Sequence, residues 1–289
     1  MILIFGASGL LGSFLTNFLI SRKYDVLGFS RSSKNNLNID LLNQQKTIKV
    51  INKYRPSIII NLVGLTSVED CETNINKAFL FNTHTAEVLS EAILRANNKC
   101  HLIHVSTDHL YNSETLAQEN QVQIVNNYAF SKYAGEMAIK KIDSHTILRT
   151  NFVGRSIVEH RQSLSDLVFE SAKNQSILKI LDDVEFSPLS MITLSEMIEL
   201  VINQKPCGIF NLGSNSGMSK ANFDLLFAKN LDLSTSYMQK IKLKDAFFLK
   251  APRPKNMKMN VSKFEDFFKI KLPTLEEEIC KIADEYRGG

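Results

Sequence analysis

The sequence predicts an α/β protein: a Rossmann-type, doubly wound parallel sheet with a smaller α+β lobe. In the first half of the chain, short apolar runs alternate with segments of helical periodicity, which is typical of a parallel sheet covered by helices on both faces. The first apolar run passes directly into a glycine-rich turn. A chain of 289 residues with 44% hydrophobic residues can bury one large core, or a main domain with a smaller one.

Each expected element follows from this alternation. The expected strands are the apolar runs MILIF, DVLGF, SIIINLV, HLIHVS and HTILRT. The expected helices run from about Leu10 to Ser21, Gln44 to Lys53, Asn74 to Ala96 and Tyr128 to Lys140. After Thr150 the pattern loosens into mixed helices and short strands such as GIFNLG. We therefore expect a dinucleotide-type domain over 1–150 and a smaller lobe over 151–289 that can interleave with it.

Several classes of protein are not expected from this composition. The start MILIFGASG lacks the features of a secretory signal and the apolar runs are too short to span a bilayer, so we expect a cytoplasmic protein without membrane segments. The four cysteines form no CxxC pair and the histidines form no HExxH motif, so neither a disulfide framework nor a metal site is expected.

The charge distribution leaves two interpretations open. The net charge is only +4, but between Lys240 and Lys271 ten Lys or Arg residues face three acids. This surplus suits an anionic small molecule, or it forms a solvated basic face. The sequence has no recognised nucleic-acid motif, so a nucleic-acid partner is not expected. For the oligomeric state, we expect a monomer or a homodimer.

The glycine turn is the first motif with a chemical meaning. In GASGLLG, Gly6 would permit a tight turn, Gly9 a close approach of backbone to a pyrophosphate, and Gly12 close packing of the following helix. The amide groups at the helix N-terminus would bind the anion. Because the turn joins the first strand to the first helix, it favours dinucleotide binding over a purely structural role.

The end of the second expected strand bears on which dinucleotide binds. A NAD-selective site commonly has an acid there, but GFSRSS offers Ser30 and Arg31. Arg31 can pair with a 2′-phosphate, which favours NADP(H) and leaves NAD(H) as the second choice; the alternative is an ordinary surface arginine. Asp40 is expected near the adenine, or else as the N-cap of the next helix.

A tyrosine and a lysine four residues apart form the second motif. In VNNYAFSKYAGE, a helix would place Tyr128 and Lys132 on one face. The motif follows a strand ending in VSTDHLY, where Ser106, Thr107 and Asp108 reach the sheet edge that binds ligands in open α/β folds. A ketone that accepts hydride needs a proton, and an ammonium that lowers the pKa of a phenol improves it as the donor. Thr107 could donate to the carbonyl oxygen.

Together these motifs resemble the extended short-chain dehydrogenase/reductase superfamily. The matching segments are GASGLLG, INLVGLTSVEDCE, FNTHTAEVL with Asn82, STDHLY, and YAFSKYAGE followed by ILRTNFVG. Within it, the chain is most similar to dTDP-4-dehydrorhamnose reductases and related sugar-nucleotide reductases. This likeness rests on Thr66, Val68 and Glu72 in LTSVEDCE, on GIFNLGS, and on APRPKNMKMNVSKFEDFFKIKLP.

The resemblance implies hydride transfer from NAD(P)H to the 4-keto group of a nucleotide-linked sugar, in polysaccharide precursor synthesis. The implied catalytic residues are Thr107, Tyr128 and Lys132. The cofactor contacts expected from the motifs and the resemblance are Gly6, Ser8, Gly9, Leu10, Leu11, Gly12, Ser30, Arg31, Asp40, Leu41, Val63, Gly64, Asn82, Tyr128 and Lys132. The expected substrate contacts are Thr66, Val68, Asp108, Asn151, Arg253 and Asn256, with Lys258 as a further candidate.

Departures from the family pattern concern the substrate. The usual proline and glycine around the tyrosine are replaced by Ile124 and Ala129. The other departures are Phe152 and Gly154 for tryptophan and tyrosine, Val184 and Phe186 for glutamine and glycine, and Met257 and Lys258 for serine and arginine. We therefore expect an altered sugar pocket and leave the sugar open.

The sequence leaves three alternative functions to compare with this one. A 4,6-dehydratase would carry a carboxylate where this chain has His109, so it is disfavoured. An epimerase/reductase of the GDP-fucose synthase kind needs a thiol and an imidazole together, and Cys100 with several histidines leaves this open. A non-catalytic NADP-binding subunit that resembles the methionine adenosyltransferase β-subunit is the third alternative.

Overall fold

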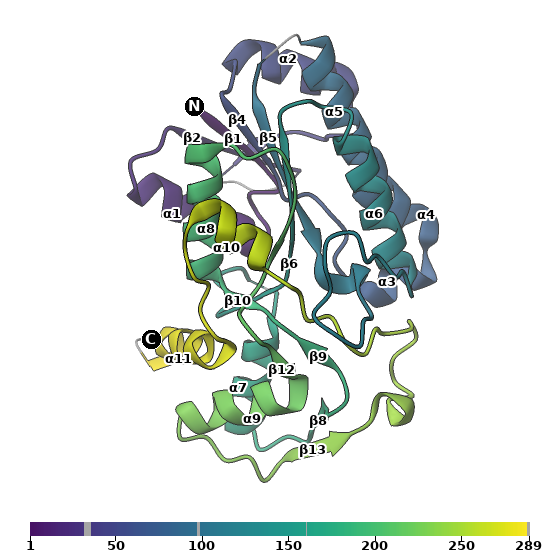
Figure 1. The fold of residues 1–289 in the computed structure, drawn as a ribbon, viewed down its shortest axis with the longest axis vertical. Helices are drawn as coiled ribbons and strands as arrows, with labels where there is room; N and C mark the ends of the chain where they lie inside the picture. The colour runs from purple at the N-terminus through teal and green to yellow at the C-terminus, as the bar shows by residue number, and fades with distance from the viewer. Residues whose placement is uncertain (32–35, 97–98, 160, 288–289) are drawn as a thin grey trace. The chain divides into compact units, whose positions relative to one another are not determined.

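The central element is a seven-stranded sheet with the strand order β11-β6-β5-β4-β1-β2-β3. A computed structural model describes residues 1–31, 36–96, 99–159 and 161–287 (Figure 1). The strands are β1 (Ile2–Phe5), β2 (Val26–Ser30), β3 (Leu37–Asn38), β4 (Ile58–Asn61), β5 (His101–Thr107), β6 (His145–Thr150) and β11 (Gly208–Leu212). Neighbouring strands from β5 to β3 pair in parallel. The predicted Rossmann-type fold is confirmed.

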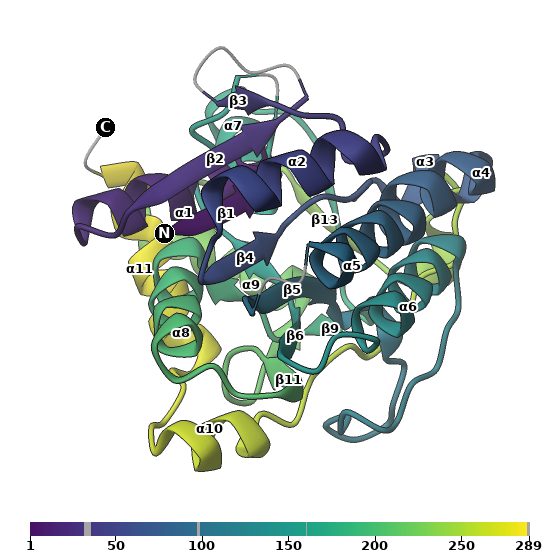
Figure 2. The ribbon, with the colours of Figure 1, turned by 90° about the horizontal axis from the view of Figure 1, so that it is seen from above.

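The central strands are apolar because both of their faces are covered. Every residue of β1, β4 and β5 is buried, as expected for parallel strands between two helical layers. Figure 2 shows α2 (Gln44–Tyr54), α5 (Thr85–Arg95) and α6 (Asn127–Ile139) along one face. Their apolar side chains pack with those of the strands, including Ile51, Leu89 and Ile139.

One expected helix has an internal irregularity. The pattern from Asn74 to Ala96 predicts a continuous helix, but the structure has α4 (Ile75–Ala78), the π-helix η1 (Phe79–His84) and then α5. The wide turn lies where α6 approaches closely, since a Cβ on Gly135 would lie 2.4 Å from the carbonyl oxygen of Asn82. Single π-turns inside helices occur frequently at functional sites. Periodicity alone cannot reveal this extra residue.

The described residues form two compact units that interleave along the chain. The first unit contains 1–107, 126–149 and 195–210, and the second contains 108–125, 150–194 and 211–289. Each unit contains residues from both sides of the expected boundary between 150 and 151. That boundary stays a prediction. GIFNLG was expected in the smaller lobe, but as β11 it forms the edge strand of the large sheet beside β6.

The second unit is an α+β assembly around its own core. Its helices are α7 (Leu164–Lys173), α9 (Lys220–Asn230), α10 (Ser262–Phe268) and α11 (Leu275–Arg287), and the start of α8 (Met191–Gln204) also belongs to it. Its short strand pairs are β7 (Phe152–Val153) with β10 (Leu189–Ser190), β9 (Glu185–Phe186) with β12 (Met218–Ser219), and β8 (Leu178–Leu181) with β13 (Met238–Ile241). Phe186, Phe223, Phe227 and Ile282 are central to this core. Among the described residues, no helix is long and apolar enough to cross a membrane.

Candidate active site

The glycine turn has the geometry that its sequence predicts. Gly6 has φ +90°, a conformation that favours glycine, and a Cβ there would lie 2.8 Å from the carbonyl carbon of Leu62. A Cβ on Gly12 would lie 2.1 Å from the carbonyl oxygen of Gly6, so only glycine lets α1 (Leu10–Ser21) pack this closely. Gly9 is the N-cap of α1, whose first turn carries no acidic side chain. The turn thus suits an anion at a helix N-terminus.

The end of β2 is attached to this turn. The backbone amides of Gly6 and Ala7 donate to the carbonyl oxygen of Phe29 at 2.9 and 3.1 Å. Ser30 is buried, and the exposed Arg31 places its guanidinium 4.5 Å from the ring centre of Phe81. Arg31 therefore lies at the strand end where a 2′-phosphate would be recognised, and its contact with the cofactor stays a prediction.

Asp40 and Leu41, both expected to contact the cofactor, have contacts within the chain. Asp40 does not cap the next helix, because Asn43 caps α2 through the amide of Lys46 and the Asp40 carboxylate accepts from the amide of Leu42. Leu41 is only 4% exposed and packs in the core of the first unit. A cofactor contact by Leu41 would therefore involve its backbone.

Tyr128 and Lys132 lie one helical turn apart on α6. The side chain of Asn126 caps the helix through the amide of Ala129. The ammonium of Lys132 donates to the carbonyl oxygen of Val105 at 2.8 Å, two residues before Thr107 ends β5. A Cβ on Gly64 would lie 3.8 Å from the same ammonium, so Lys132 reaches the loop that follows β4. The structure thus brings Lys132 to the carboxyl end of β5, where Thr107 lies.

Burial sets the electrostatics of Lys132. Tyr128 is 8% exposed and Lys132 is 6% exposed. Loss of solvent lowers the pKa of Lys132 to about 8, and the negative charge of Glu136 opposes this shift. An amine with this pKa titrates close to neutral pH, as expected for a group at a reactive centre.

Asn82 shapes the loop that carries Val63 and Gly64. From the π-helix, its amide oxygen accepts from the amide of Leu65 at 2.7 Å, and its amide nitrogen donates to the carbonyl oxygen of Leu65 at 3.1 Å and to the hydroxyl of Ser131 at 2.9 Å. These contacts fix the loop beside Lys132. A direct contact of Asn82 with a cofactor stays a prediction.

Of the expected substrate residues, Val68 lies beside the tyrosine. At the start of α3 (Val68–Thr73), it packs against the apolar cluster that contains Tyr128, Cys71 and Ala78. Thr66 is exposed just before that helix. Glu72 ties α3 to α6, since its carboxylate accepts from the amide of Asn127 at 3.0 Å.

Asp108 and Asn151 of the second unit are in direct contact. The amide of Asn151 donates to the carboxylate of Asp108 at 2.7 Å, and Asp108 is 1% exposed. Because Asp108 follows Thr107 in the chain, this contact lies directly after the carboxyl end of β5. Polar groups of this kind can bind sugar hydroxyls.

The sequence of this chain matches a known protein family over nearly its whole length. A family model described as "RmlD substrate binding domain" matches residues 1–287. The chain belongs to the RmlD substrate binding domain family.

Individual relatives agree with this assignment. A dTDP-4-dehydrorhamnose reductase of Aggregatibacter actinomycetemcomitans is 28% identical over 63% of this chain, which corresponds to 60% of that protein's length. The spore coat polysaccharide biosynthesis protein SpsK of Bacillus subtilis is 27% identical over 75% of this chain and 74% of its own length. The crystal structure of dTDP-4-dehydrorhamnose reductase from Bacillus anthracis, in complex with NADP, has a TM-score of 0.89 at 22% identity and covers 98% of both chains. At that identity the structural likeness shows the shared fold.

The basic segment is partly neutralised in this RmlD-family chain, since five of its ten Lys and Arg residues form ion pairs among the described residues. Its lysines form ion pairs with nearby acids: Lys240 and Lys242 with Asp182, Lys255 with Asp183, Lys258 with Glu185, and Lys271 with Glu265. Because Lys258 is already paired with Glu185, it is a weaker candidate for binding an anionic substrate than its sequence position indicates. The guanidinium of Arg253 donates to the carbonyl oxygen of Ala251, and the side chain of Asn256 accepts from the amide of Lys258.

Several departures from the family pattern have a packing explanation. Val184, Phe186 and Met257 are each 1% exposed in the core of the second unit. A Cβ on Gly154 would lie 2.9 Å from the terminal methyl group of Met191 and 3.0 Å from the carboxylate of Glu285, so a larger residue would require these two flexible side chains to move. Core packing therefore accounts for Val184, Phe186 and Met257.

Sequence analysis did not identify two groups of polar residues. One is the ion pair of Glu136 with Arg149, which the spacing of Tyr128, Lys132 and Glu136 along one helix face could have indicated. The other is Lys220 at the start of α9, whose ammonium lies 5.7 Å from the ring centre of Phe186 and whose pKa is lowered by burial. No motif signals Lys220.

His109 and Cys100 bear on the dehydratase and epimerase alternatives. Burial lowers the pKa of His109 to about 3, so this side chain is a neutral imidazole and not a carboxylate-like base. Cys100 directly precedes β5, whereas Thr107 ends it, so the two lie at opposite ends of the strand. Burial raises the pKa of the Cys100 thiol to about 11, so this thiol is neutral near neutral pH.

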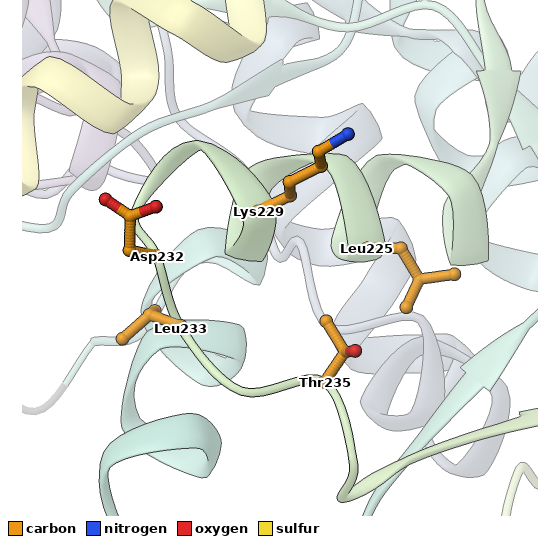
Figure 3. Close-up of a pocket in the computed structure, with 5 residues that line it drawn as sticks. All are labelled: Leu225, Lys229, Asp232, Leu233 and Thr235. Atoms are coloured by element: carbon orange, nitrogen blue, oxygen red, sulfur yellow. The ribbon is translucent and has the colours of Figure 1, made fainter.

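A surface hollow lies apart from these residues in the sequence. Figure 3 shows it on α9 and the chain that follows, lined by Leu225, Lys229, Asp232, Leu233 and Thr235. It contains none of the expected site residues.

Proposed function

We propose that this chain is an oxidoreductase that uses NAD(P)H to reduce the 4-keto group of a nucleotide-linked deoxysugar, in the manner of dTDP-4-dehydrorhamnose reductases. Membership of the RmlD family and the names of its relatives support this reaction class. A role in polysaccharide precursor synthesis fits the relative SpsK. A cytoplasmic location and a monomeric or homodimeric state stay predictions.

One observation carries the proposal. Lys132 shares a helix face with Tyr128, is bonded to the backbone at the carboxyl end of β5, and reaches the loop at Gly64. The carboxyl ends of parallel strands form the edge where open α/β sheets bind ligands. The position of the ammonium at this edge supports a site in which the phenol of Tyr128 and the hydroxyl of Thr107 act beside it, as carbonyl reduction requires.

The residues of the chain fit a dinucleotide. The positive φ of Gly6, the close packing at Gly12 and the acid-free first turn of α1 form a cradle for a pyrophosphate. When bound, NAD(P)H supplies the hydride that adds to the carbonyl carbon. Lys132 is assigned to bind the ribose beside the nicotinamide.

Proton transfer is assigned to Tyr128. As the carbonyl oxygen gains negative charge, the phenol gives its proton to that oxygen, and the product is a secondary alcohol. Lys132 favours the resulting phenolate by its positive charge, and Thr107 donates a hydrogen bond to the same oxygen. Asp108, Asn151, Arg253 and Asn256, together with Thr66 and Val68, are proposed to bind the sugar and its diphosphate.

A turnover assay tests the reaction. The purified chain is mixed with NADPH and a panel of freshly prepared nucleotide-linked 4-keto-6-deoxysugars, and NADPH absorbance and products are followed. We expect turnover with at least one substrate, and the Tyr128→Phe variant should lower kcat by roughly 10²–10⁴-fold because it removes only the proton donor. NADPH affinity should be unchanged.

Two outcomes would contradict the assignment. Tight NADPH binding with no turnover of any sugar nucleotide would favour the regulatory-subunit alternative. Undiminished kcat in Tyr128→Phe would remove Tyr128 from the mechanism.

The cofactor preference follows from Arg31. The relative from Bacillus anthracis was crystallised with NADP, and Arg31 at the end of β2 can pair with the extra phosphate. We expect Arg31→Ala to raise the Kd for NADPH by about tenfold, since one charge-assisted contact contributes on the order of 1.5 kcal/mol, and to leave that for NADH unchanged. Calorimetric titration with both cofactors measures this. Equal losses for both cofactors would place Arg31 elsewhere.

A further inference from the structure

A third polar residue continues the face of α6 that carries Tyr128 and Lys132. Glu136 lies four residues after Lys132, and its side chain is 0% exposed. Its carboxylate accepts from Arg149 Nε at 2.9 Å, from Arg149 Nη2 at 2.7 Å and from the Ser106 hydroxyl at 2.6 Å. A buried carboxylate with this many donors is held in one orientation.

The Ser106 contact joins α6 to the catalytic end of β5. Ser106 lies between Val105, whose carbonyl oxygen binds Lys132, and Thr107, which ends the strand. The helix is thus bonded to two consecutive residues of β5, once through Lys132 and once through Glu136. Any shift of α6 against β5 must break both contacts.

Glu136 is also the charged group that favours the protonated form of Lys132. The groups that face Lys132 from the packed elements are Tyr128 and Glu136 on α6, Cys71 on α3, and His104 on β5. Burial raises the pKa of Cys71 to about 11 and lowers that of His104 far below its ordinary value, so both are neutral near neutral pH. Within the described chain, Glu136 therefore supplies the negative charge.

We propose that Glu136 is a positioning residue for the reaction: anchored by Arg149 and Ser106, it fixes α6 on the end of β5 and keeps the Lys132 amine protonated beside Tyr128. This rests on the proposed function, in which that ammonium favours the phenolate. Arg149 in turn fixes the orientation of Glu136, since its guanidinium donates to both carboxylate oxygens.

The first measurement requires no turnover. The pKa of Lys132 is read from NMR spectra of lysines labelled at Cε, with Lys132→Met used only to assign the resonance. Because a single change at Glu136 would leave Arg149 buried without its partner, the test variant is Glu136→Gln with Arg149→Met, which removes both charges. We expect the pKa of Lys132 to fall by about 1 unit. An unchanged pKa in the folded double variant overturns the proposal.

The second measurement is the pH profile of kcat at saturating NADPH. The alkaline limb should move to lower pH in the double variant, by the same amount as the pKa of Lys132 in the NADPH complex. Ser106→Ala is the matched control, since it cuts the link to β5 and keeps both charges; it should lower kcat by about threefold to tenfold without moving the limb. An equal movement of the limb in Ser106→Ala would overturn the charge assignment.

The two measurements separate the failure of each proposal. A wild-type chain that turns over no sugar nucleotide refutes the reductase function, while the NMR titration still decides whether Glu136 controls Lys132. If the wild type turns over a sugar nucleotide but the double variant changes neither the pKa of Lys132 nor the alkaline limb of the kcat profile, only the proposed role of Glu136 is refuted.

Discussion

Two helices of this chain carry a lysine followed four residues later by a buried acid, and the two pairs have different surroundings. On α6 the pair is Lys132 and Glu136, and on α9 it is Lys220 and Asp224. Glu136 is 0% exposed and accepts from Arg149 and Ser106. Asp224 is 3% exposed, and its Oδ1 has no hydrogen-bond partner among the described residues.

The consequences for charge differ accordingly. Burial raises the pKa of Asp224 to about 7, and the nearby Lys220 only partly opposes this shift. On α6, the carboxylate has an arginine bound to both oxygens, and the lysine is bonded to the backbone. Helical spacing thus brings two charges to one face, while the hydrogen-bond donors on neighbouring elements decide how much free energy their burial costs.

The largest expected effect comes from removing the partner of Glu136. Arg149→Ala should lower the free energy of unfolding by about 3–5 kcal/mol, because it leaves a buried carboxylate without its counter-charge. Urea denaturation measures the change. The double variant Glu136→Gln with Arg149→Met should recover much of the loss. A loss below about 1 kcal/mol in Arg149→Ala would show that the pair on α6 is no better satisfied than the one on α9.

The pair on α9 predicts a pH effect of intermediate size. The folded-state pKa of Asp224 lies near 7, above the ordinary value of 3.8, so the folded chain binds this proton more tightly than the unfolded chain. The protonated carboxyl is therefore tolerated at low pH, and stability falls as pH rises between these two values. We expect a loss on the order of 2–4 kcal/mol over that range.

The matched variant is Asp224→Asn, which cannot ionise. Unfolding free energies measured across the same pH range should lose this decline, and the variant should be more stable than the wild type at the alkaline end. An identical pH dependence in both proteins would show that Asp224 is solvated or paired in solution, and the contrast with Glu136 would disappear.

The smallest effect is expected at the exposed pairs of the second unit. Asp182 accepts from both Lys240 and Lys242, which lowers its pKa, but all three side chains are substantially exposed to solvent. Water screens such pairs and the long side chains lose entropy on pairing. Lys240→Ala should leave the urea midpoint unchanged within error. A clear fall would mean that exposed and buried pairs in this chain are not energetically distinct.

Much of the site was predictable because it depends on local sequence. The spacing of Gly6, Gly9 and Gly12 and the i, i+4 spacing of Tyr128 and Lys132 survive in the structure as a tight turn and a shared helix face. The helix predicted from Leu10 to Ser21 is confirmed at both ends, since its apolar periodicity and flanking residues define it locally. Local rules were insufficient for Asp40, because Asn43 lies closer to the helix and takes the cap.

By itself, the sequence determined the order of the main strands and helices up to about residue 150, the glycine turn and the shared helix face of Tyr128 and Lys132, because periodicity and spacing act over a few residues. Only the tertiary structure decided that GIFNLG forms the edge strand of the large sheet and that the helix around Asn82 widens into a π-turn. It also decided that Glu136 has hydrogen-bond donors, whereas Oδ1 of Asp224 has none within the described chain. These outcomes depend on which distant residues pack together. Pairing energy and desolvation are properties of those contacts, and they are not encoded in the spacing along the chain.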